Sequence, residues 1–388
     1  SLLGTDAVNE NTLKFIPPAP DAGVTTSVFW ESPFSKFMIF ITVMWWSNHS
    51  TDGGGYIIQR MSSAKNERHA LLATLWFNIA HYSLRVWPWI IVAVVSIVLF
   101  PIIPEAYSDL GVKAGYPLVM NSLLGPGMKG ILIVSFLAAF MSTIDTHLNW
   151  GSSYMINDIY KRFFKPNESE RHYVFVGKIF TVVLMILAAF TAMKMQSISK
   201  AWEFIFSMGA GIGLVLILRW FWWRINAWSE ITALATSIII TISLEILAWS
   251  QTIAAGKPYE LFGSSPVLFG ISLQVHHKLM IIVPLAIIAW VTATFLTEPE
   301  SEETLTAFYK RVQPGGWWAP ISQGFEHTMQ PLTQGFFIQW IAGVLMIYGL
   351  TFGIGNLIFL NYSYAVILFG AAGIGFYLIW NRSLSKLD

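Results

Sequence analysis

The sequence predicts an all-α integral membrane protein with about nine transmembrane helices. Of its 388 residues, 55% are hydrophobic and only 12% are charged, whereas a soluble domain carries about 25% charged residues. The apolar residues come in long blocks, and a helix needs ~20 such residues to cross a bilayer. The net charge of +1 gives no support for a nucleic-acid partner. The absence of cysteine excludes disulfides and thiolate metal sites.

Nine apolar blocks have the length of a membrane span. They lie at roughly 34–50, 70–101, 129–160, 172–195, 201–223, 229–250, 277–297, 334–353 and 360–380. Lys and Arg concentrate in every second connection, starting after the first block, whereas 102–128 carries only Lys113 and 251–275 only Lys257. Because positive residues favour the cytoplasmic side, this alternation predicts an extracellular N-terminus and a cytoplasmic C-terminus. We therefore expect a multi-pass protein of the cell membrane.

The regions outside these blocks complete the predicted organisation. Residues 1–33 are expected to form an extracellular segment. Residues 298–333 begin with a run rich in glutamate and are expected to form a cytoplasmic loop with an amphipathic segment. The chain starts with Ser1 rather than Met, which we interpret as a start inside a longer reading frame.

The third block carries a polar stripe inside a segment that is otherwise apolar. Its members recur at helical spacing and fall on one face of the helix. They are Ser142, Asp145, Thr146, Asn149 and Ser153. Thr143 lies beside this stripe, and Ala139 lies one turn earlier, so that the Ala139 carbonyl faces the hydroxyls of Ser142 and Thr143.

Two interpretations of this stripe remain open from the spacing alone. An unpartnered Asp at the middle of a membrane costs ~3 kcal/mol or more, so the stripe must face protein, water or an ion. A hard cation such as Na⁺ suits it, because such ions take oxygen ligands from hydroxyls, carbonyls and carboxylates. A polar seam between two helices is the alternative, since Ser and Thr commonly join membrane helices.

The first block ends in a stretch that disfavours a helix. Apolar residues run from Phe37 to Trp46 and are followed by polar residues and three successive glycines, 53–55. Each glycine destabilises a helix by ~1 kcal/mol, so the helix is expected to break here. Non-helical backbone at membrane depth survives only beside a cavity or inside protein, and many transporters use such breaks to bind substrates and ions. An ordinary loop that closes a short span is the alternative.

The second block contains His81 and Arg85, four residues apart on one face, with Asn78 one turn earlier. Ionisable groups inside a membrane are functional candidates. Arg85 is expected to bind a carboxylate or to pair with an acid on another span, and Glu203 is one candidate partner. Snorkelling or a structural ion pair is the alternative.

Enzyme chemistry finds little support in the sequence. No nucleophile and base pair, phosphate-binding glycine loop or metal motif is evident. The pair His276–His277 lacks a third ligand at metal spacing and is interpreted as interfacial.

Three stretches resemble the sodium:solute symporter family, which includes sodium/glucose, sodium/proline and sodium/sialic acid cotransporters. Residues 138–149 with 157–162 resemble its signature span, residues 56–65 the start of the next span, and residues 221–226 the end of its sugar-contacting helix. The resemblance implies a LeuT-like fold with two inverted five-helix repeats around a midplane site. Residues 34–223 would then be the second repeat and 224–388 the C-terminal transmembrane helices. The first repeat, in the N-terminal half of the same transporter, would be a partner of this chain.

The same resemblance implies sodium ligands on the third block. The main sodium site would use the carbonyl of Ala139 and the hydroxyls of Ser142 and Thr143, with its other ligands on the first repeat. A second sodium site, present in some members, would use Ser142, Asp145 and Thr146. Those members usually carry Ser at the position of Asp145, and a carboxylate there would either strengthen cation binding or serve a proton.

Substrate contacts are also implied by the resemblance. They match the broken stretch Asn48, His49 and Ser50, then His81, then Trp202 or Glu203. Arg85 joins these candidates because of its place in the second block. Sugar-transporting members typically carry Lys at the position of His81, so this chain departs from the sugar-transporting pattern.

The predicted function is sodium-coupled symport of a small polar organic solute by alternating access, with Na⁺ as the coupling ion. The expected partners are the solute, sodium ions and the lipid bilayer, without nucleic acid. The alternatives are a proton-coupled transporter that uses Asp145 and a symporter-like membrane sensor module. A membrane enzyme would need a catalytic cluster that the sequence does not offer.

Overall fold

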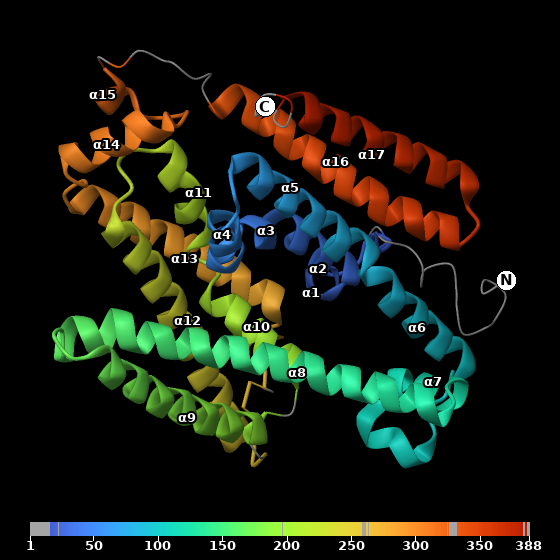
Figure 1. Ribbon diagram of the computed structural model, residues 1–388. Coiled ribbons are helices and arrows are strands. Elements are labelled where there is room, and N and C mark those ends of the chain that lie inside the picture. Colours follow the sequence, from blue (N-terminus) through green and yellow to red (C-terminus); the bar gives the residue numbers. More distant parts are fainter. Residues whose placement is uncertain are drawn as a thin grey trace.

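The computed structural model describes residues 16–385, apart from short gaps. These gaps are residues 22, 196, 258–260, 263, 324, 326–331 and 383–384. The described residues are helical except for loops and one short hairpin. The α8–α9 pair and the α16–α17 pair lie along opposite edges of the molecule, and most other helices lie between them (Figure 1).

The first third of the chain forms short helices followed by one long one. Its elements are α1 (Thr26–Glu31), α2 (Pro33–Ile39), η1 (Phe40–Met44), α3 (Trp45–Ser47), α4 (Gly54–Ser62), α5 (Glu67–Asn78), η2 (Ile79–Leu84), α6 (Val86–Leu99), η3 (Glu105–Ala114) and α7 (Gly115–Leu123). The segments η1 and η2 are wider π-helical turns, and η3 is a 3₁₀ segment. α5, η2 and α6 run on as one helix.

The rest of the chain consists mainly of long helices. Its elements are α8 (Pro126–Tyr154), η4 (Met155–Phe164), α9 (Glu170–Lys194), α10 (Ile198–Met208), α11 (Gly213–Phe221), α12 (Ala227–Ala254), β1 (Val267–Leu268), β2 (Ile271–Ser272), α13 (Val275–Leu296), α14 (Glu302–Val312), α15 (Ala319–Ser322), α16 (Leu332–Ile358) and α17 (Tyr362–Arg382). The segment η4 is π-helical and continues α8. The strands β1 and β2 form an antiparallel hairpin.

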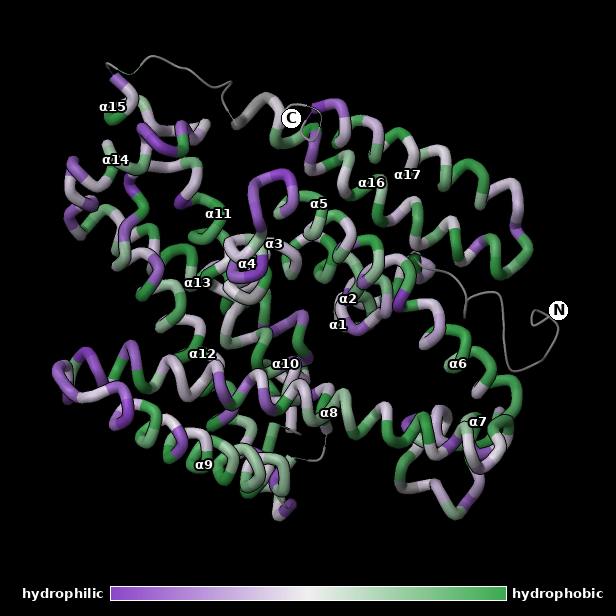
Figure 2. The backbone as a smooth tube through the Cα atoms, viewed as in Figure 1, coloured by the Kyte–Doolittle hydropathy of each residue, from purple (hydrophilic) through white to green (hydrophobic). Residues whose placement is uncertain are grey.

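Eight helical segments among the described residues are long and apolar enough to cross a membrane. They correspond to the second to ninth predicted blocks. Figure 2 shows the same long helices as mostly hydrophobic, with hydrophilic residues at the connections. The predicted class, an all-α integral membrane protein, is confirmed. The first predicted block does not form an unbroken helix of this length, so the count of nine and the LeuT-like arrangement stay predictions.

The predicted break in the first block is confirmed. The helical run that begins at Pro33 ends at Ser47, and helix resumes at Gly54. Gly53 has a φ of 97°, a left-handed conformation that glycine adopts readily because it has no Cβ. The turn is held locally, since the Gly54 amide donates to Asp52 Oδ1 at 3.0 Å.

A second break divides the fifth predicted block. The span predicted over 201–223 is present as the membrane segment Ile198–Phe221. Its helix stops at Met208 and resumes at Gly213, with turns between them, and this interruption was not predicted. Close approach of another backbone explains the glycine at this point: a Cβ on Gly213 would lie 2.2 Å from the Trp46 carbonyl oxygen and 2.6 Å from the Asn48 carbonyl oxygen. The two breaks therefore pack directly against each other.

The best-buried core lies between these breaks and the helices α12 and α13. One buried cluster joins the first broken helix to α13 and the second break; its members are Ile39, Met44, Ala210, Leu279, Ile282 and Val283. A second cluster joins α11 to α12 and α13; its members are Ile212, Val215, Leu216, Ala233 and Trp290. Because apolar packing of this kind is dense and resists deformation, α12 and α13 hold the two breaks in place.

The helix α8 is almost uncovered by comparison. None of its apolar window is buried, whereas 44% of the window over α10 and α11 is buried. It packs mainly along α9 (Figure 1). The opposite edge is tied more closely to the centre: Ser83 Oγ donates to the Ile347 carbonyl at 3.2 Å and Trp87 Nε1 to the Thr351 carbonyl at 3.0 Å.

The predicted loop 298–333 contains the helix α14. Its residues Leu305 and Tyr309 are buried with Trp318 in a small separate cluster, while its first turn is acidic and its last turn basic. The loop is attached to the membrane helices because Trp318 Nε1 donates to the Trp220 carbonyl at 3.1 Å. The amphipathic segment expected in this loop is therefore present.

A buried ion pair links α12 to α13 within their spans. Lys278 Nζ lies 3.3 Å from Glu245 Oε1, and both side chains are about 10% exposed or less. We predict that Lys278→Met lowers the free energy of unfolding by ~3–5 kcal/mol, because it removes the Lys278 ammonium group from beside the buried Glu245 carboxylate. The double variant Glu245→Leu/Lys278→Met should recover most of this loss. Thermal unfolding of the purified protein in detergent checks both values, and a double variant as unstable as the single one would contradict the pairing.

Candidate functional site

The polar stripe of α8 is built as the sequence predicted. The Ala139 carbonyl accepts hydrogen bonds from Ser142 Oγ at 3.1 Å and from Thr143 Oγ1 at 2.9 Å. One turn later, Thr146 Oγ1 donates to the Ser142 carbonyl at 2.9 Å, and Asn149 Nδ2 donates to Asp145 Oδ1 at 3.0 Å. The structure thus brings together all five residues proposed to bind sodium on one helix. Figure 2 shows hydrophilic residues gathering in the second half of α8.

The chemistry of this stripe suits a cation. A hydroxyl that donates its hydrogen to a carbonyl keeps two lone pairs with which it can accept. Ser142 and Thr143 both donate back to Ala139, so their oxygens remain available to a positive charge. Among the described residues Asp145 makes no ion pair, and its one hydrogen bond is to a neutral amide. The stripe therefore presents carboxylate, hydroxyl and carbonyl oxygens, and no cationic side chain among the described residues pairs with Asp145.

The stripe is nevertheless open on its outer side. Ala139, Ser142, Thr143, Asp145 and Thr146 are all exposed. A hard cation takes several oxygen ligands distributed around it, and α8 supplies them from one direction only. That these oxygens form one wall of an ion site stays a prediction.

The three candidate residues of the first break are held at the joint between the two breaks. The ring atom His49 Nδ1 lies 2.6 Å from the place where a Cβ on Gly209 would be. Asn48 Nδ2 donates to the Met44 carbonyl at 3.0 Å, and Asn48 Oδ1 accepts from the Ser50 amide at 2.7 Å. The amide side chain of Asn48 thus replaces helical hydrogen bonding where the backbone leaves the helix.

The other substrate candidates lie apart from this joint. His81 belongs to the π-helical segment η2 and stacks on Phe77, with ring centroids 4.9 Å apart. Such π segments often occur at functional sites, but the ring contacts of His81 are with its own helix. Trp202, on α10, is 54% exposed and packs on Phe206. The structure therefore joins His49 of the first break to Gly209 of the second, and it does not join the first break to His81 or Trp202 among the described residues.

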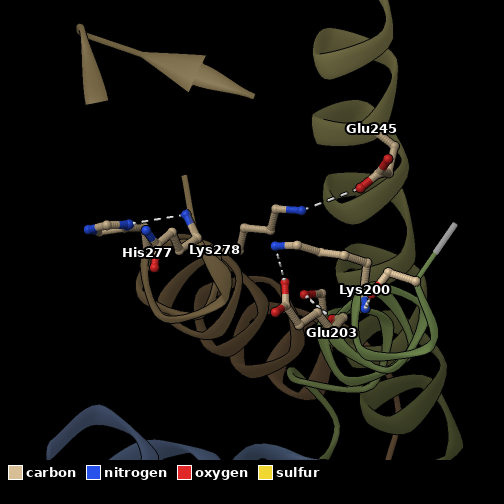
Figure 3. Close-up of polar contacts among 8 residues, drawn as sticks. Lys200, Glu203, Glu245, His277 and Lys278 are labelled. Atoms are coloured by element: carbon tan, nitrogen blue, oxygen red, sulfur yellow. Dashed lines mark hydrogen bonds and ion pairs between the residues drawn. The ribbon is translucent and has the colours of Figure 1, made fainter. Parts of the chain in front are cut away.

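The suggested pairing of Arg85 with Glu203 is wrong. Glu203 Oε2 lies 2.9 Å from Lys200 Nζ, one turn earlier on the same helix (Figure 3). Arg85 is exposed and makes no ion pair with any described residue. Glu203 pairs with Lys200 because residues three apart on a helix lie side by side. The role of Arg85 toward a substrate stays a prediction.

An ion pair that no sequence pattern predicted connects the two broken helices. Arg219 Nη2, on α11, lies 2.8 Å from Asp52 Oδ2, and its Nη1 lies 3.7 Å from Glu230 Oε2 on α12. The sequence alone assigned a site role to neither Asp52 nor Arg219. The sequence did offer one signal for this pair, because Asp52 lies inside a glycine-rich break. A carboxylate requires a charge partner if such a break is packed within protein.

We predict that this ion pair acts as a unit. Asp52→Asn and Arg219→Gln should each lower solute uptake, and each should cost ~1–2 kcal/mol of stability, because the pair is charged but Arg219 is partly exposed. The double variant should be no worse than either single variant, since both remove the same interaction. Uptake and thermal unfolding of all three variants form the test. Strictly additive losses would contradict a direct pairing.

A membrane bundle whose two interrupted helices meet at their breaks is an architecture typical of membrane transporters. Residues 16–239, more than half of the chain, match the sodium:solute symporter family. The chain belongs to this family. The match includes α8, both breaks and every candidate site residue named above.

Curated relatives agree with this assignment over parts of their length. The high-affinity proline transporter PutP of Bacillus subtilis is 31% identical over 146 residues, which are 36% of this chain and 29% of that protein. The sodium/glucose cotransporter 4 of Danio rerio is 24% identical over 237 residues, 56% of this chain and 34% of that protein. The human sodium/myo-inositol cotransporter 2 is 25% identical over 275 residues, 64% of this chain and 39% of that protein. The matches span about a third of the length of these relatives, which are transporters rather than enzymes.

Proposed function

We propose that this protein carries out sodium-coupled symport of a small polar organic solute. The observation that carries the proposal is the group of oxygen atoms around the Ala139 carbonyl on α8. In this proposal Ala139, Ser142 and Thr143 bind the main sodium ion, and Asp145 and Thr146 contribute with Ser142 to a second one. Membership of the family and relatives named as sodium cotransporters support the same reading.

The open face of α8 supports a further part of the proposal. A polar stripe in a membrane must be covered by protein, water or an ion, and no described helix covers it. We therefore assign to the N-terminal half of the same transporter the remaining sodium ligands and the cover over α8. Residues 34–223 would then be the second repeat of a LeuT-like core, and 224–388 would be helices that support it.

The proposed solute site lies at the joint of the two breaks. Asn48, His49 and Ser50 stand where two stretches of non-helical backbone meet, which is how transporters expose polar backbone groups to a substrate. His81, Arg85, Trp202 and Glu203 would approach this site in other states of the transport cycle. Proline, glucose and myo-inositol, the solutes in the names of the relatives, are the first compounds to test.

Proton coupling is the second candidate function, and one observation favours it. Asp145 is a carboxylate without a cationic partner among the described residues, so a proton could neutralise it in place of sodium. Sodium uses the whole stripe, whereas a proton needs only this carboxylate. Asp145→Ser should therefore abolish coupling to protons and leave sodium coupling largely intact.

Uptake into proteoliposomes under imposed gradients tests the proposed function. With an inward sodium gradient, at least one of the three solutes should accumulate above its external concentration, and replacement of sodium by potassium should abolish the accumulation. Accumulation that follows a proton gradient without sodium would favour the role of Asp145 in proton transfer. No accumulation of any of these solutes under either gradient would contradict the proposal.

The proposed orientation has its own test, because the chain contains no cysteine to give background labelling. A membrane-impermeant maleimide added to intact cells should label Lys257→Cys, which lies in the connection proposed to be extracellular. It should label Arg311→Cys, at the end of α14, only after the cells are made permeable. The reverse pattern would invert the orientation.

A further inference from the structure

A cavity of about 260 Å³ lies between the end of α2 and the first turns of α10 and α13. We call it the lysine cavity; its lining residues are Lys36, Ile39, Phe40, Lys200, Glu203, Gln274, Val275, His276 and Leu279. A pocket with a mainly apolar wall and a few convergent polar groups is the usual form of a small-molecule site. The orientation predicted from the basic loops places this end of the bundle outside the cell.

The charges around the lysine cavity leave one cation without a partner. Lys200 is paired with Glu203 at 2.9 Å, and Lys278, behind the cavity, is paired with Glu245 at 3.3 Å. Figure 3 shows both pairs, with each ammonium group turned towards its own carboxylate. Lys36 is half-buried in the cavity wall, and its ammonium group makes no ion pair or hydrogen bond with any described residue. The cavity thus offers one free ammonium group to an anion.

A carboxylate acceptor lines the same cavity. Glu203 lies in the wall, and its Oε2 contacts Lys200 Nζ at 2.9 Å. A carboxylate has two oxygens that can accept several hydrogen bonds, so this contact leaves Glu203 able to accept from a ligand. The ring of His276 also borders the cavity, but it is only 2% exposed, and its Nε2 is bonded to the Trp30 carbonyl oxygen at 2.9 Å.

We propose that the lysine cavity binds a small carboxylate that carries a hydrogen-bond donor beside its carboxyl group, as a hydroxy acid or an amino acid does. The carboxylate pairs with the Lys36 ammonium group, and the donor binds the Glu203 carboxylate. The inference deepens the proposed function, on which it rests for its role: the cavity would hold the solute at the outer mouth before it reaches the joint of the breaks.

The test measures binding without transport. Equilibrium dialysis of the purified protein in sodium-free potassium buffer uses radiolabelled L-proline and L-lactate as the two donor-bearing probes, and acetate as the probe without a donor. We expect saturable binding of L-proline or L-lactate, and at least ~10-fold weaker binding of acetate, because acetate has no donor for the Glu203 carboxylate and a hydrogen bond to a charged group contributes strongly. Binding of L-proline alone would identify an amino acid, and binding of L-lactate alone a hydroxy acid.

Two substitutions decide whether the bound probe lies in this cavity. Lys36→Met keeps the aliphatic stem and should weaken probe binding by ~10-fold or more, since it removes a charged hydrogen-bond donor. Lys36→Gln serves the same purpose if the first variant fails to fold. Lys194→Ala removes a lysine outside the cavity, at the end of α9, and should leave binding unchanged. The proposal would be overturned if the Lys36 variants bound the probes as well as the unaltered protein does. It would also be overturned if neither donor-bearing probe showed saturable binding.

The sodium site and the lysine cavity can fail independently. A Ser142→Ala/Thr143→Val variant should lose sodium coupling and still bind the probe in sodium-free buffer. A Lys36→Met variant should show the opposite pattern, with weakened probe binding and an unchanged sodium concentration for half-maximal uptake. If the Ser142→Ala/Thr143→Val variant no longer binds the probe, the probe binds at the proposed transport site. That result would overturn a separate site at Lys36.

Discussion

Replacing Ser142 with Ala and Thr143 with Val should raise the sodium concentration needed for half-maximal uptake by ~10-fold or more. Both side chains keep nearly the same volume, so packing changes little, but two oxygen atoms disappear from beside the Ala139 carbonyl. Each lost polar contact to a charge is worth ~1.5–3 kcal/mol, and that amount corresponds to a ~10-fold or larger change in affinity. Uptake of solute as a function of sodium concentration measures the effect.

Ser135→Ala is the matched control for this pair. Ser135 also lies on α8 and donates its hydroxyl hydrogen to a carbonyl four residues earlier, that of Ile131, at 2.8 Å. It lies ~10 Å from Ser142 along the helix, too far to bind the same ion. The control should keep the sodium dependence of the unaltered protein. If the double variant also keeps the sodium dependence of the unaltered protein, α8 does not contribute ligands to the sodium site.

Gly213→Ala should abolish uptake and lower the free energy of unfolding by ~1–3 kcal/mol, the usual cost of overpacking a dense core. The added Cβ would lie 2.2 Å from the Trp46 carbonyl oxygen and 2.5 Å from the Ser47 carbonyl carbon. These are backbone atoms, which cannot rotate away as a side chain can. The two broken helices must therefore separate, and the joint proposed to hold the solute opens. Thermal unfolding and uptake of the same preparation give both quantities.

Gly373→Ala provides the comparison, because Gly373 lies inside helix α17 and nothing is within 4 Å of the place where its Cβ would be. Alanine is the better helix former by ~1 kcal/mol, so this variant should be neutral or slightly stabilised. If Gly213→Ala behaves in the same way, the contact between the two breaks is not required for transport.

The features that could be predicted from the sequence depend on local patterns. The stripe from Ser142 to Thr146 follows from helical spacing, and the break after Ser47 follows from successive glycines in an apolar context. In both cases the residues that define the feature are neighbours along the chain. The resemblance added roles for them, and those roles stay predictions because no contact within the described residues tests a bound ion.

The features that the sequence did not reveal depend on distance between helices. Hydropathy continues across Gly209 to Gly213, so the second break leaves no gap in the apolar pattern. The need for glycine at 213 comes from the backbone of Trp46–Asn48, which lies against it. The Asp52–Arg219 pair spans 167 positions of the chain, and no local pattern couples these residues. Glu203 was assigned a distant partner when the nearer Lys200 takes its carboxylate.

Binding of radioactive sodium-22 to the purified protein decides whether α8 supplies sodium ligands, when the unaltered chain is compared with the Ser142→Ala/Thr143→Val variant. We expect saturable binding by the unaltered protein and by Ser135→Ala. The affinity of the double variant for sodium should be at least ~10-fold lower, because the ion then loses two of its oxygen ligands. Equal sodium affinity in all three proteins would contradict the assignment of α8 as a wall of the sodium site.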